Sequence, residues 1–356
     1  MHGLNILHPG FLSHVPYPGN LASQALFAIF TGAERKNMDD HPLAVTELSK
    51  IYHKSLGMMS FAAVDSITFS VRQGEILGFL GSNGAGKSTT IKMLCGILLP
   101  TSGDATVGGF SVSKEPDKVK QKIGYMSQKF SLYNDLTVEE NINFFGSVYG
   151  LKNKELKERK EWVVKIAYLK GKEKLLTGSL PGGIKQRLAL GTAVIHRPEI
   201  VFLDEPTSGV DPISRRNFWD LINDLSSEGT TLFVTTHYLE EAEFCNNIIL
   251  IDSGQLIAEG SSKELKKMLA DYQVFEIESE NSAQIFEILE GDPLIEEVSY
   301  FGNKIHLIAK QTSDSKERFG KLLLNKMQVD RINIQKISPT LEDVFIHLLK
   351  MKNNAS

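Results

Sequence analysis

Cysteine is nearly absent from the sequence, with only Cys95 and Cys245 among 356 residues. The two lie far apart and lack the spacing of metal ligands, so the sequence indicates neither a disulfide framework nor a zinc site. Long apolar runs are also missing, because no stretch reaches the roughly 20 apolar residues that cross a bilayer. We therefore do not expect the chain itself to form a membrane pore.

An excess of either charge is missing too. The sequence has 39 Lys and Arg against 43 Asp and Glu, a net charge of −4, which gives no electrostatic reason to expect nucleic-acid binding. The hydrophobic fraction of 42% and the charged fraction of 23% are ordinary for a water-soluble globular chain. The length favours two domains over one.

Residues 1–42 are predicted to form an N-terminal extension, either untranslated or disordered. The first 37 residues are rich in His, Pro and Gly and show no clean periodicity. Their apolar segment Leu21–Phe30 has no Lys or Arg before it, unlike a signal peptide. Because Met38 directly precedes the first domain-like segment, we hypothesise that translation begins there. A peptide from the first 37 residues in the native protein would refute this.

Two regions of different pattern follow. Residues 43–262 alternate apolar runs with helical patterns, which predicts an α/β domain. Within it, residues 43–52 and 64–81 are each predicted to be a strand, and helices at 138–149 and 152–169 predict a helical subdomain. Residues 263–356 follow the order β-α-β-β-α-β, which predicts a small α+β accessory domain of ferredoxin-like type. A closing helix is expected to begin at Pro339.

A glycine-rich loop between a strand and a helix fits the phosphate-loop pattern GxxxxGK[ST]. Its glycines let backbone N–H groups turn toward phosphate oxygens, its lysine meets the β and γ charges, and its serine holds Mg²⁺. The helix N-terminus adds a partial positive charge. The nucleotide-binding residues predicted here are Gly81, Ser82, Asn83, Gly84, Ala85, Gly86, Lys87, Ser88 and Thr89.

Two adjacent acidic residues directly follow the apolar run IVFL at residues 200–203. Asp204 is expected to reach the magnesium shell, and Glu205 is expected to lie beside the attacking water as general base or water-orienting group. An apolar strand that ends in Asp-Glu is common by itself. Its meaning comes from following a phosphate loop in the same domain.

The segment LPGGIKQR, Leu180–Arg187, resembles the signature sequence of ABC ATPases, LSGGQ followed by a basic-Gln-Arg run. Other landmarks of that family occur in order: Tyr52 resembles the adenine-stacking aromatic, Gln128 the Q-loop, Ser208–Asp211 the D-loop and His237 the switch histidine. The resemblance covers about residues 43–262. It implies the fold of a P-loop NTPase with an ABC nucleotide-binding domain.

The resemblance also implies roles. Gln128 would touch Mg²⁺ and the water while its loop contacts a membrane partner, and His237 would bond the γ-phosphate. Tyr52 would stack on adenine. Catalysis would rest on Glu205, His237 and Gln128, the metal on Ser88, Gln128 and Asp204, and further nucleotide contacts on Gly182, Gly183 and Asp211.

The signature departs from LSGGQ at two positions, Pro181 for serine and Ile184 for glutamine. Proline at the first position of a helix costs little, but it removes a hydroxyl donor. We expect ATP still to close a dimer, with a weaker grip or slower turnover.

ABC ATPases sandwich two ATP molecules between two copies, so a second ATPase subunit is implied, most simply another copy of this chain. The ending ISPTLEDVFIHLL resembles the tail of ATPase subunits of ABC-2 type exporters, multidrug and antibiotic exporters included. This implies a polytopic permease partner and a peripheral place on the cytoplasmic face of the inner membrane. A periplasmic adaptor and the exported compound are left open.

Two other functions stay open. A soluble regulatory ABC ATPase would use ATP-driven dimerisation without any permease, and copurification from native membranes would discriminate. A different P-loop NTPase, such as a GTPase, would be detected by nucleotide competition.

Overall fold

A computed structural model of the chain describes residues 41–53, 60–129, 131–279, 281–312, 315–327 and 332–355. Residues 1–40 of the predicted extension, with the candidate start Met38, lie outside the described residues.

A six-stranded sheet forms the centre of the nucleotide-binding part, in the order β10-β9-β3-β8-β7-β6. All its neighbouring strands pair in parallel except β10 with β9. Every residue of β3, β7 and β8 is buried, as their continuous apolar runs favour. The strands are β3 (Ile76–Leu80), β6 (Ile123–Met126), β7 (Ile200–Asp204), β8 (Thr231–Thr236), β9 (Asn247–Asp252) and β10 (Gln255–Gly260).

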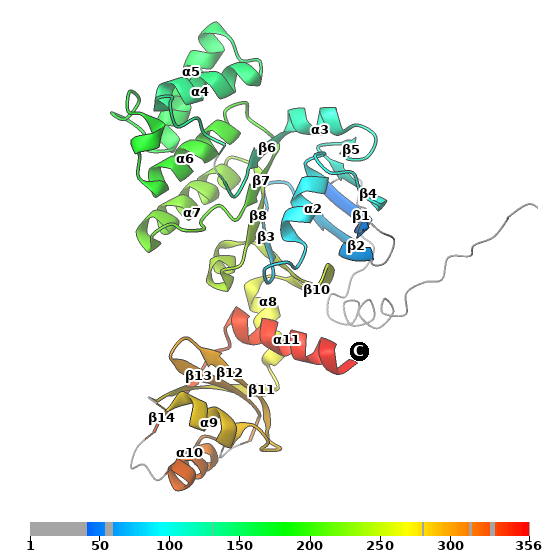
Figure 1. Cartoon of the computed structure of the whole chain (residues 1–356), viewed down its shortest axis with the longest axis vertical. Coiled ribbons are helices and arrows are strands. Elements are labelled where there is room, and N and C mark those ends of the chain that lie inside the picture. The colour runs from blue at the N-terminus through cyan, green and yellow to red at the C-terminus, as the bar shows by residue number, and fades with distance from the viewer. Residues whose placement is uncertain are drawn as a thin grey trace, which may run out of the picture.

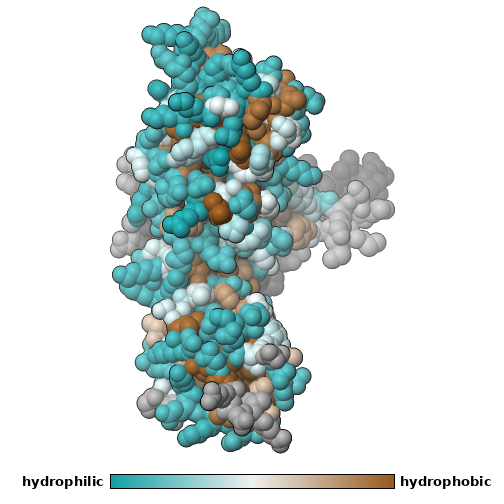
Figure 2. Space-filling model, turned by 90° about the vertical axis from the view of Figure 1, so that its left-hand side faces the viewer, coloured by the Kyte–Doolittle hydropathy of each residue, from teal (hydrophilic) through white to brown (hydrophobic). Residues whose placement is uncertain are grey.

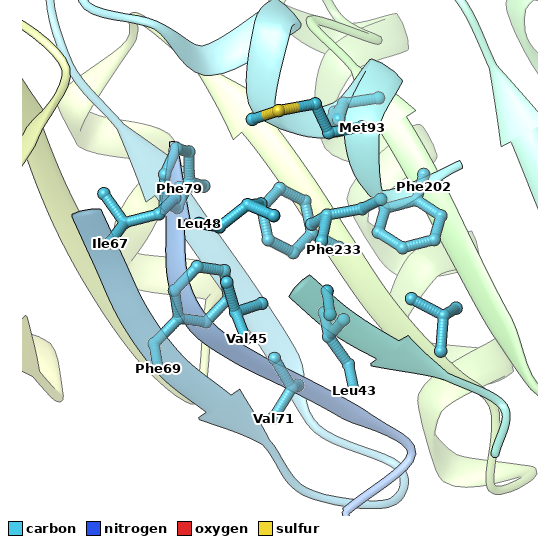
Figure 3. Packing of buried hydrophobic residues seen from close by; sticks show 14 of the residues in the cluster. Leu43, Val45, Leu48, Ile67, Phe69, Val71, Phe79, Met93, Phe202 and Phe233 are labelled. Carbon is cyan, nitrogen blue, oxygen red and sulfur yellow. The ribbon is translucent and has the colours of Figure 1, made fainter. Parts of the chain in front are cut away.

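Helices cover the two faces of this sheet (Figure 1). On one face Phe79, Phe202 and Phe233 pack in one cluster with residues of α2 (Lys87–Leu94) (Figure 3). On the other face the alternate residues of the same strands pack against α6 (Gly182–Ala193) and α7 (Pro212–Ser227). The phosphate-loop helix and the helix of the signature-like segment are therefore on opposite sides of one sheet.

An antiparallel sheet packs onto the α2 side, in the order β2-β1-β4-β5. The prediction of a single strand at 64–81 is wrong, because the chain turns at Gly74 (φ 71°) and its two halves enter different sheets. Strands β4 and β5 and helix α3 have no counterpart among the elements that the sequence predicts. The elements are β1 (Leu43–His53), β2 (Ser60–Val71), β4 (Ser102–Val107), β5 (Phe110–Ser111) and α3 (Pro116–Lys122).

The helical subdomain contains α4 (Val138–Val148) and α5 (Asn153–Ile166), close to the predicted ranges. Thr137 and Glu140 cap α4 reciprocally, which stabilises its first turn. Both helices share an apolar cluster with α6, so the subdomain is attached to the signature-like helix. A short 3₁₀ turn, η2 (Thr177–Ser179), precedes it.

The C-terminal part has a four-stranded antiparallel sheet in the order β12-β13-β11-β14 with two helices. This is the split βαβ arrangement that the sequence predicts. Its elements are β11 (Tyr272–Glu278), α9 (Ser282–Leu289), β12 (Ile295–Phe301), β13 (Lys304–Lys310), α10 (Ser315–Met327) and β14 (Asn333–Ile337). The elements η3 (Leu239–Phe244), α8 (Ser262–Lys266) and η4 (Lys267–Leu269) lie before it in the chain.

The closing helix α11 (Leu341–Ala355) lies between the two parts of the molecule (Figure 1). It begins at Leu341 rather than at the predicted Pro339, because Thr340 caps it: the Thr340 hydroxyl accepts from Asp343 N at 3.2 Å. Leu341, Val344 and Leu348 share one buried cluster with strands β9 and β10. Among the described residues, no helix is both long and apolar enough to span a membrane.

Candidate nucleotide site

The phosphate loop connects the buried strand β3 to α2, as predicted. Gly86 is the N-cap of α2 and has φ 109°, a conformation that L side chains rarely adopt. A Cβ at this position would lie 2.4 Å from the carbonyl oxygen of Ala63, so only glycine fits. The loop thus places the first N–H groups of α2 where they can meet an anion.

Lys87 is buried at the base of this loop, with 4% of its surface exposed. Its Nζ donates to the carbonyl oxygens of Gly81 at 2.8 Å and Ser82 at 3.1 Å, and lies 3.6 Å from Glu205 Oε1. Burial lowers the pKa of Lys87, and the Glu205 carboxylate offsets part of that effect. The ammonium is therefore fixed at the loop, as a phosphate-binding lysine requires.

Ser88 and Asp204 meet across the gap between α2 and β7. The Ser88 hydroxyl donates to Asp204 Oδ1 at 3.1 Å, and the Thr235 hydroxyl of the next strand donates to the same atom at 2.8 Å. Asp204 is 4% exposed. A buried carboxylate beside hydroxyl oxygens is a donor set that suits Mg²⁺ together with phosphate oxygens, so the residues present fit the expected ion.

Glu205 stands at the carboxyl end of β7 in a left-handed backbone conformation, with φ 47°. Such a conformation is costly for a residue other than glycine and is held here by the Glu205 N–H, which donates to Thr235 O at 3.1 Å and Thr235 Oγ1 at 3.0 Å. Gln128 Nε2 donates to Glu205 Oε2 at 2.9 Å, and His237 Nδ1 lies 3.4 Å from the same oxygen. The three predicted catalytic side chains therefore meet at one carboxylate.

Other predicted residues contact different partners. Tyr52, at the end of β1, is 43% exposed and lies under the Lys50 ammonium at 5.5 Å. The Asp211 carboxylate accepts from Ser214 N at 2.9 Å and caps α7, and these hydrogen bonds lower its pKa. Their predicted contacts with nucleotide stay predictions.

The signature-like segment begins α6 differently from the expectation. Pro181 is the N-cap residue rather than the first helical residue, and it gives no side-chain cap. Gly182 is exposed, whereas Gly183 is buried against α7: a Cβ on Gly183 would lie 2.4 Å from Ser214 Oγ. The N-terminal end of α6, at Pro181 and Gly182, is therefore exposed at the surface of this chain.

Sequence reasoning missed three side chains near the site: Thr235, Thr207 and Gln186. Thr235 pairs with Asp204 because β7 and β8 are neighbours in register. Gln186 Nε2 donates to the carbonyl oxygen of Pro206, and the Thr207 hydroxyl donates to Glu241. Gln186 lies inside the quoted signature-like segment, whereas the signal for Thr207 and Thr235 was only their closeness to the quoted motifs.

The parallel sheet, the phosphate loop and the Asp204–Glu205 pair define a P-loop nucleotide-binding domain of the α/β class. Comparison with protein families matches residues 64–208 to the description "ABC transporter". Residues 260–349 match "ATP-binding protein DrrA1-3-like, C-terminal domain".

Curated relatives agree with this match. The chain is 42% identical over 215 residues to the linearmycin resistance ATP-binding protein LnrL of Bacillus subtilis, covering 60% of this chain and 69% of LnrL. It is 33% identical over 293 residues to the Nod factor export ATP-binding protein I of Rhizobium sp., covering 80% and 91%. The chain therefore belongs to the family of ABC transporter ATP-binding proteins.

A third relative is longer than this chain. The probable multidrug ABC transporter ATP-binding protein YbhF of Escherichia coli is 51% identical over 211 residues, which are 59% of this chain and 36% of YbhF. The match thus spans little more than a third of YbhF.

Solved structures share the fold of the nucleotide-binding part. The ATP-binding cassette MJ0796, a dimer bound to ADP and Pi, is 26% identical with a TM-score of 0.56, covering 62% of this chain and 98% of that chain. CbiO1 from Clostridium perfringens is 27% identical with a TM-score of 0.57, covering 65% and 94%.

Proposed function

We propose that this chain is the ATP-binding and ATP-hydrolysing subunit of an ABC-2 type exporter and works as a dimer with a separate polytopic permease. The observation that carries the proposal is the convergence of Lys87, Gln128 and His237 on Glu205, beside the Ser88–Asp204 pair. Glu205 would accept a proton from the attacking water or orient that water. His237 and Gln128 would hold the Glu205 carboxylate in position. Bound Mg²⁺ would neutralise phosphate charge and would be held by Ser88, Asp204 and Gln128.

A second copy is needed because one chain cannot complete the site. The phosphate loop and the tip of α6 lie on opposite sides of one sheet, and each would serve a nucleotide shared with the other copy. Gly182 is exposed with no atom within 4 Å of an added Cβ, which leaves room for the partner's nucleotide. The dimeric state of MJ0796 supports this assembly.

The permease contact would lie on the helical subdomain. Figure 2, which views the molecule from the side of α4 to α7, shows hydrophobic patches within a mainly hydrophilic surface in its upper half. Large apolar side chains of this region are exposed, with Val148 at 64%, Leu176 at 53% and Tyr133 at 49%. An exposed apolar patch of this kind suits a protein partner. The chain would then lie peripherally on the cytoplasmic face of the inner membrane.

The transported compounds would be drugs or other small amphipathic molecules. Relatives are named for linearmycin resistance, Nod factor export and probable multidrug transport. The C-terminal match to the DrrA-like family supports the same exporter type. A periplasmic adaptor would extend such a system across a second membrane, and an adaptor gene beside this one would indicate it.

Copurification tests the transport function. The protein should bring down a polytopic membrane protein when it is gently extracted from its own membranes, and the complex should hydrolyse Mg-ATP. The Lys87→Ala variant serves as a control that should keep the partner and lose hydrolysis. Recovery of an active ATPase with no polytopic protein would instead support the soluble regulatory ABC ATPase.

A further inference from the structure

Glu241 is a buried carboxylate behind the candidate site. It lies in η3, four residues after His237, and only 2% of its surface is exposed. Burial raises the pKa of Glu241, and the Thr207 hydroxyl offsets part of that effect. A carboxylate in such a place needs specific partners, because burying it without them is costly.

The partners of Glu241 come from the segment that follows Glu205. The Thr207 hydroxyl donates to Glu241 Oε1 at 2.5 Å, and Thr207 is itself 1% exposed. Arg215 Nε, at the start of α7, lies 3.2 Å from the same oxygen in a charge contact that lacks hydrogen-bond alignment. Glu241 therefore links η3 to the chain on both sides of the D-loop-like residues 208–211.

Arg215 also contacts the segment that contains the switch histidine. Its guanidinium lies 4.2 Å from the centre of the Tyr238 ring, and that ring lies 4.1 Å from the His237 ring. Gln186 of α6 donates a further hydrogen bond to the segment after Glu205, at the carbonyl oxygen of Pro206. The two residues after Glu205 are thus held between η3 and the signature-like helix.

We infer that Glu241 is a positioning residue that fixes the segment after Glu205 relative to His237, so that both side chains face the same phosphate. The inference deepens the proposed function and rests on it. Glu241 touches neither nucleotide nor water in this role and acts through Thr207 and Arg215. Removing its charge frees Arg215 and lets the two segments shift, and a shift of about 1 Å can cost on the order of 10²-fold in rate.

Glu241→Gln tests this with Glu243→Gln as the matched control. Glu243 lies in the same η3 but is 45% exposed, and it pairs with Lys266 at 2.6 Å and with Ser262 at 2.7 Å. We expect Glu241→Gln to lower kcat by about 10- to 100-fold and leave the KM for ATP within about threefold of the wild type. Glu243→Gln should resemble the wild type in both.

A double-mutant cycle separates positioning from general destabilisation. Arg215→Met should lower kcat, and Arg215→Met/Glu241→Gln should be no slower than the slower single variant, because both changes remove the same charge contact between Arg215 and Glu241. Equal kcat in Glu241→Gln and Glu243→Gln would overturn the inference. The inference would also be overturned if Glu241→Gln lost ATP binding and thermal stability in proportion to its loss of kcat. That result would show that Glu241 only stabilises the fold. If the wild type itself hydrolyses no Mg-ATP, it is the proposed function that fails.

Discussion

At the scale of single residues, Glu205 is the side chain on which hydrolysis depends. Glu205→Gln should keep ATP binding and lower turnover by roughly 10²- to 10⁴-fold, the usual worth of a positioned base. The measurement is single-turnover hydrolysis of Mg-ATP beside a nucleotide-binding assay. This variant should form stable dimers at saturating Mg-ATP, because ATP hydrolysis no longer separates the two subunits.

Glu199→Gln is the control for that experiment. Glu199 precedes the opposite end of β7, is 48% exposed and pairs with Lys122 at 2.6 Å, so its turnover should stay near the wild-type value. Near-normal hydrolysis by Glu205→Gln, or a Glu205→Gln protein that remains monomeric alone and with its permease, would contradict the assigned role.

Glu297 gives a prediction about pH. This β12 residue is 6% exposed, and burial raises its pKa from 4.5 to about 7. The groups that face it are His347 (3.8 Å), Lys350 and Asp343 on α11, and Glu296 beside it in β12. Since protonated Glu297 is favoured in the fold, its stabilising contribution is complete below about pH 4.5 and is lost as pH rises through about 7.

Glu297→Gln should remove this dependence. The variant's free energy of unfolding minus that of the wild type should be larger at pH 8 than at pH 4.5 by about 3 kcal/mol, on the order of 1.4 kcal/mol per unit of pKa shift. The variant is thus more stable relative to the wild type at pH 8. Urea unfolding at the two pH values measures this. The exposed Glu290→Gln should follow the wild type, and an equal difference at both pH values would show that Glu297 stays ionised in the fold.

At the scale of elements, α6 begins at an uncapped proline. Pro181→Ser should supply a hydroxyl that accepts a hydrogen bond from a free backbone N–H of the first turn. This should raise the stability of the protein by about 1 kcal/mol. It should also raise ATP turnover, since the hydroxyl faces the nucleotide of the other copy in the proposed dimer. Thermal unfolding and hydrolysis assays measure both effects, with Pro181→Ala as control. If serine and alanine behave alike, the hydroxyl has no part in either.

The sequence predicts elements whose signal is local. The phosphate loop, the strand that ends in Asp204 and Glu205, and the β-α-β-β-α-β order each follow from spacing or periodicity, and the structure has these elements. The break at Gly74 was missed because the apolar run of β3 continues the alternation of β2 with no Pro or Asn between them.

Contacts that depend on strand order do not follow from spacing or periodicity, although the family resemblance places Gln128 and Glu205 at the same water. The bond of Thr235 to Asp204 joins residues 31 apart in the chain, and the bond of Gln128 to Glu205 joins residues 77 apart. Glu241 resembles any surface glutamate of an acidic turn until the fold buries it beside Thr207. The local motifs therefore identify the site, and only the sheet topology shows what positions it.

At the scale of the whole molecule, α11 joins the nucleotide-binding part to the accessory part. Its buried apolar residues share one cluster with β9 and β10, the strands that follow the switch-histidine segment, and with Val274 of β11 and Ile308 of β13. Other residues of the helix face the C-terminal sheet, where Asp343 Oδ1 lies 2.7 Å from His306 Nδ1, both 1% exposed. The shared core predicts that the two parts unfold together.

Leu348→Ala tests that coupling. Leu348 is 3% exposed in the shared cluster, and truncating a buried leucine costs about 2–5 kcal/mol. Calorimetry should show one cooperative transition in the wild type and two in this variant, because the change weakens the apolar cluster through which α11 joins the two parts. Met351→Ala, on the same helix but 37% exposed, should keep one transition. Two transitions already present in the wild type would mean that α11 does not couple the parts, and the accessory part would then be free to move while ATP is bound.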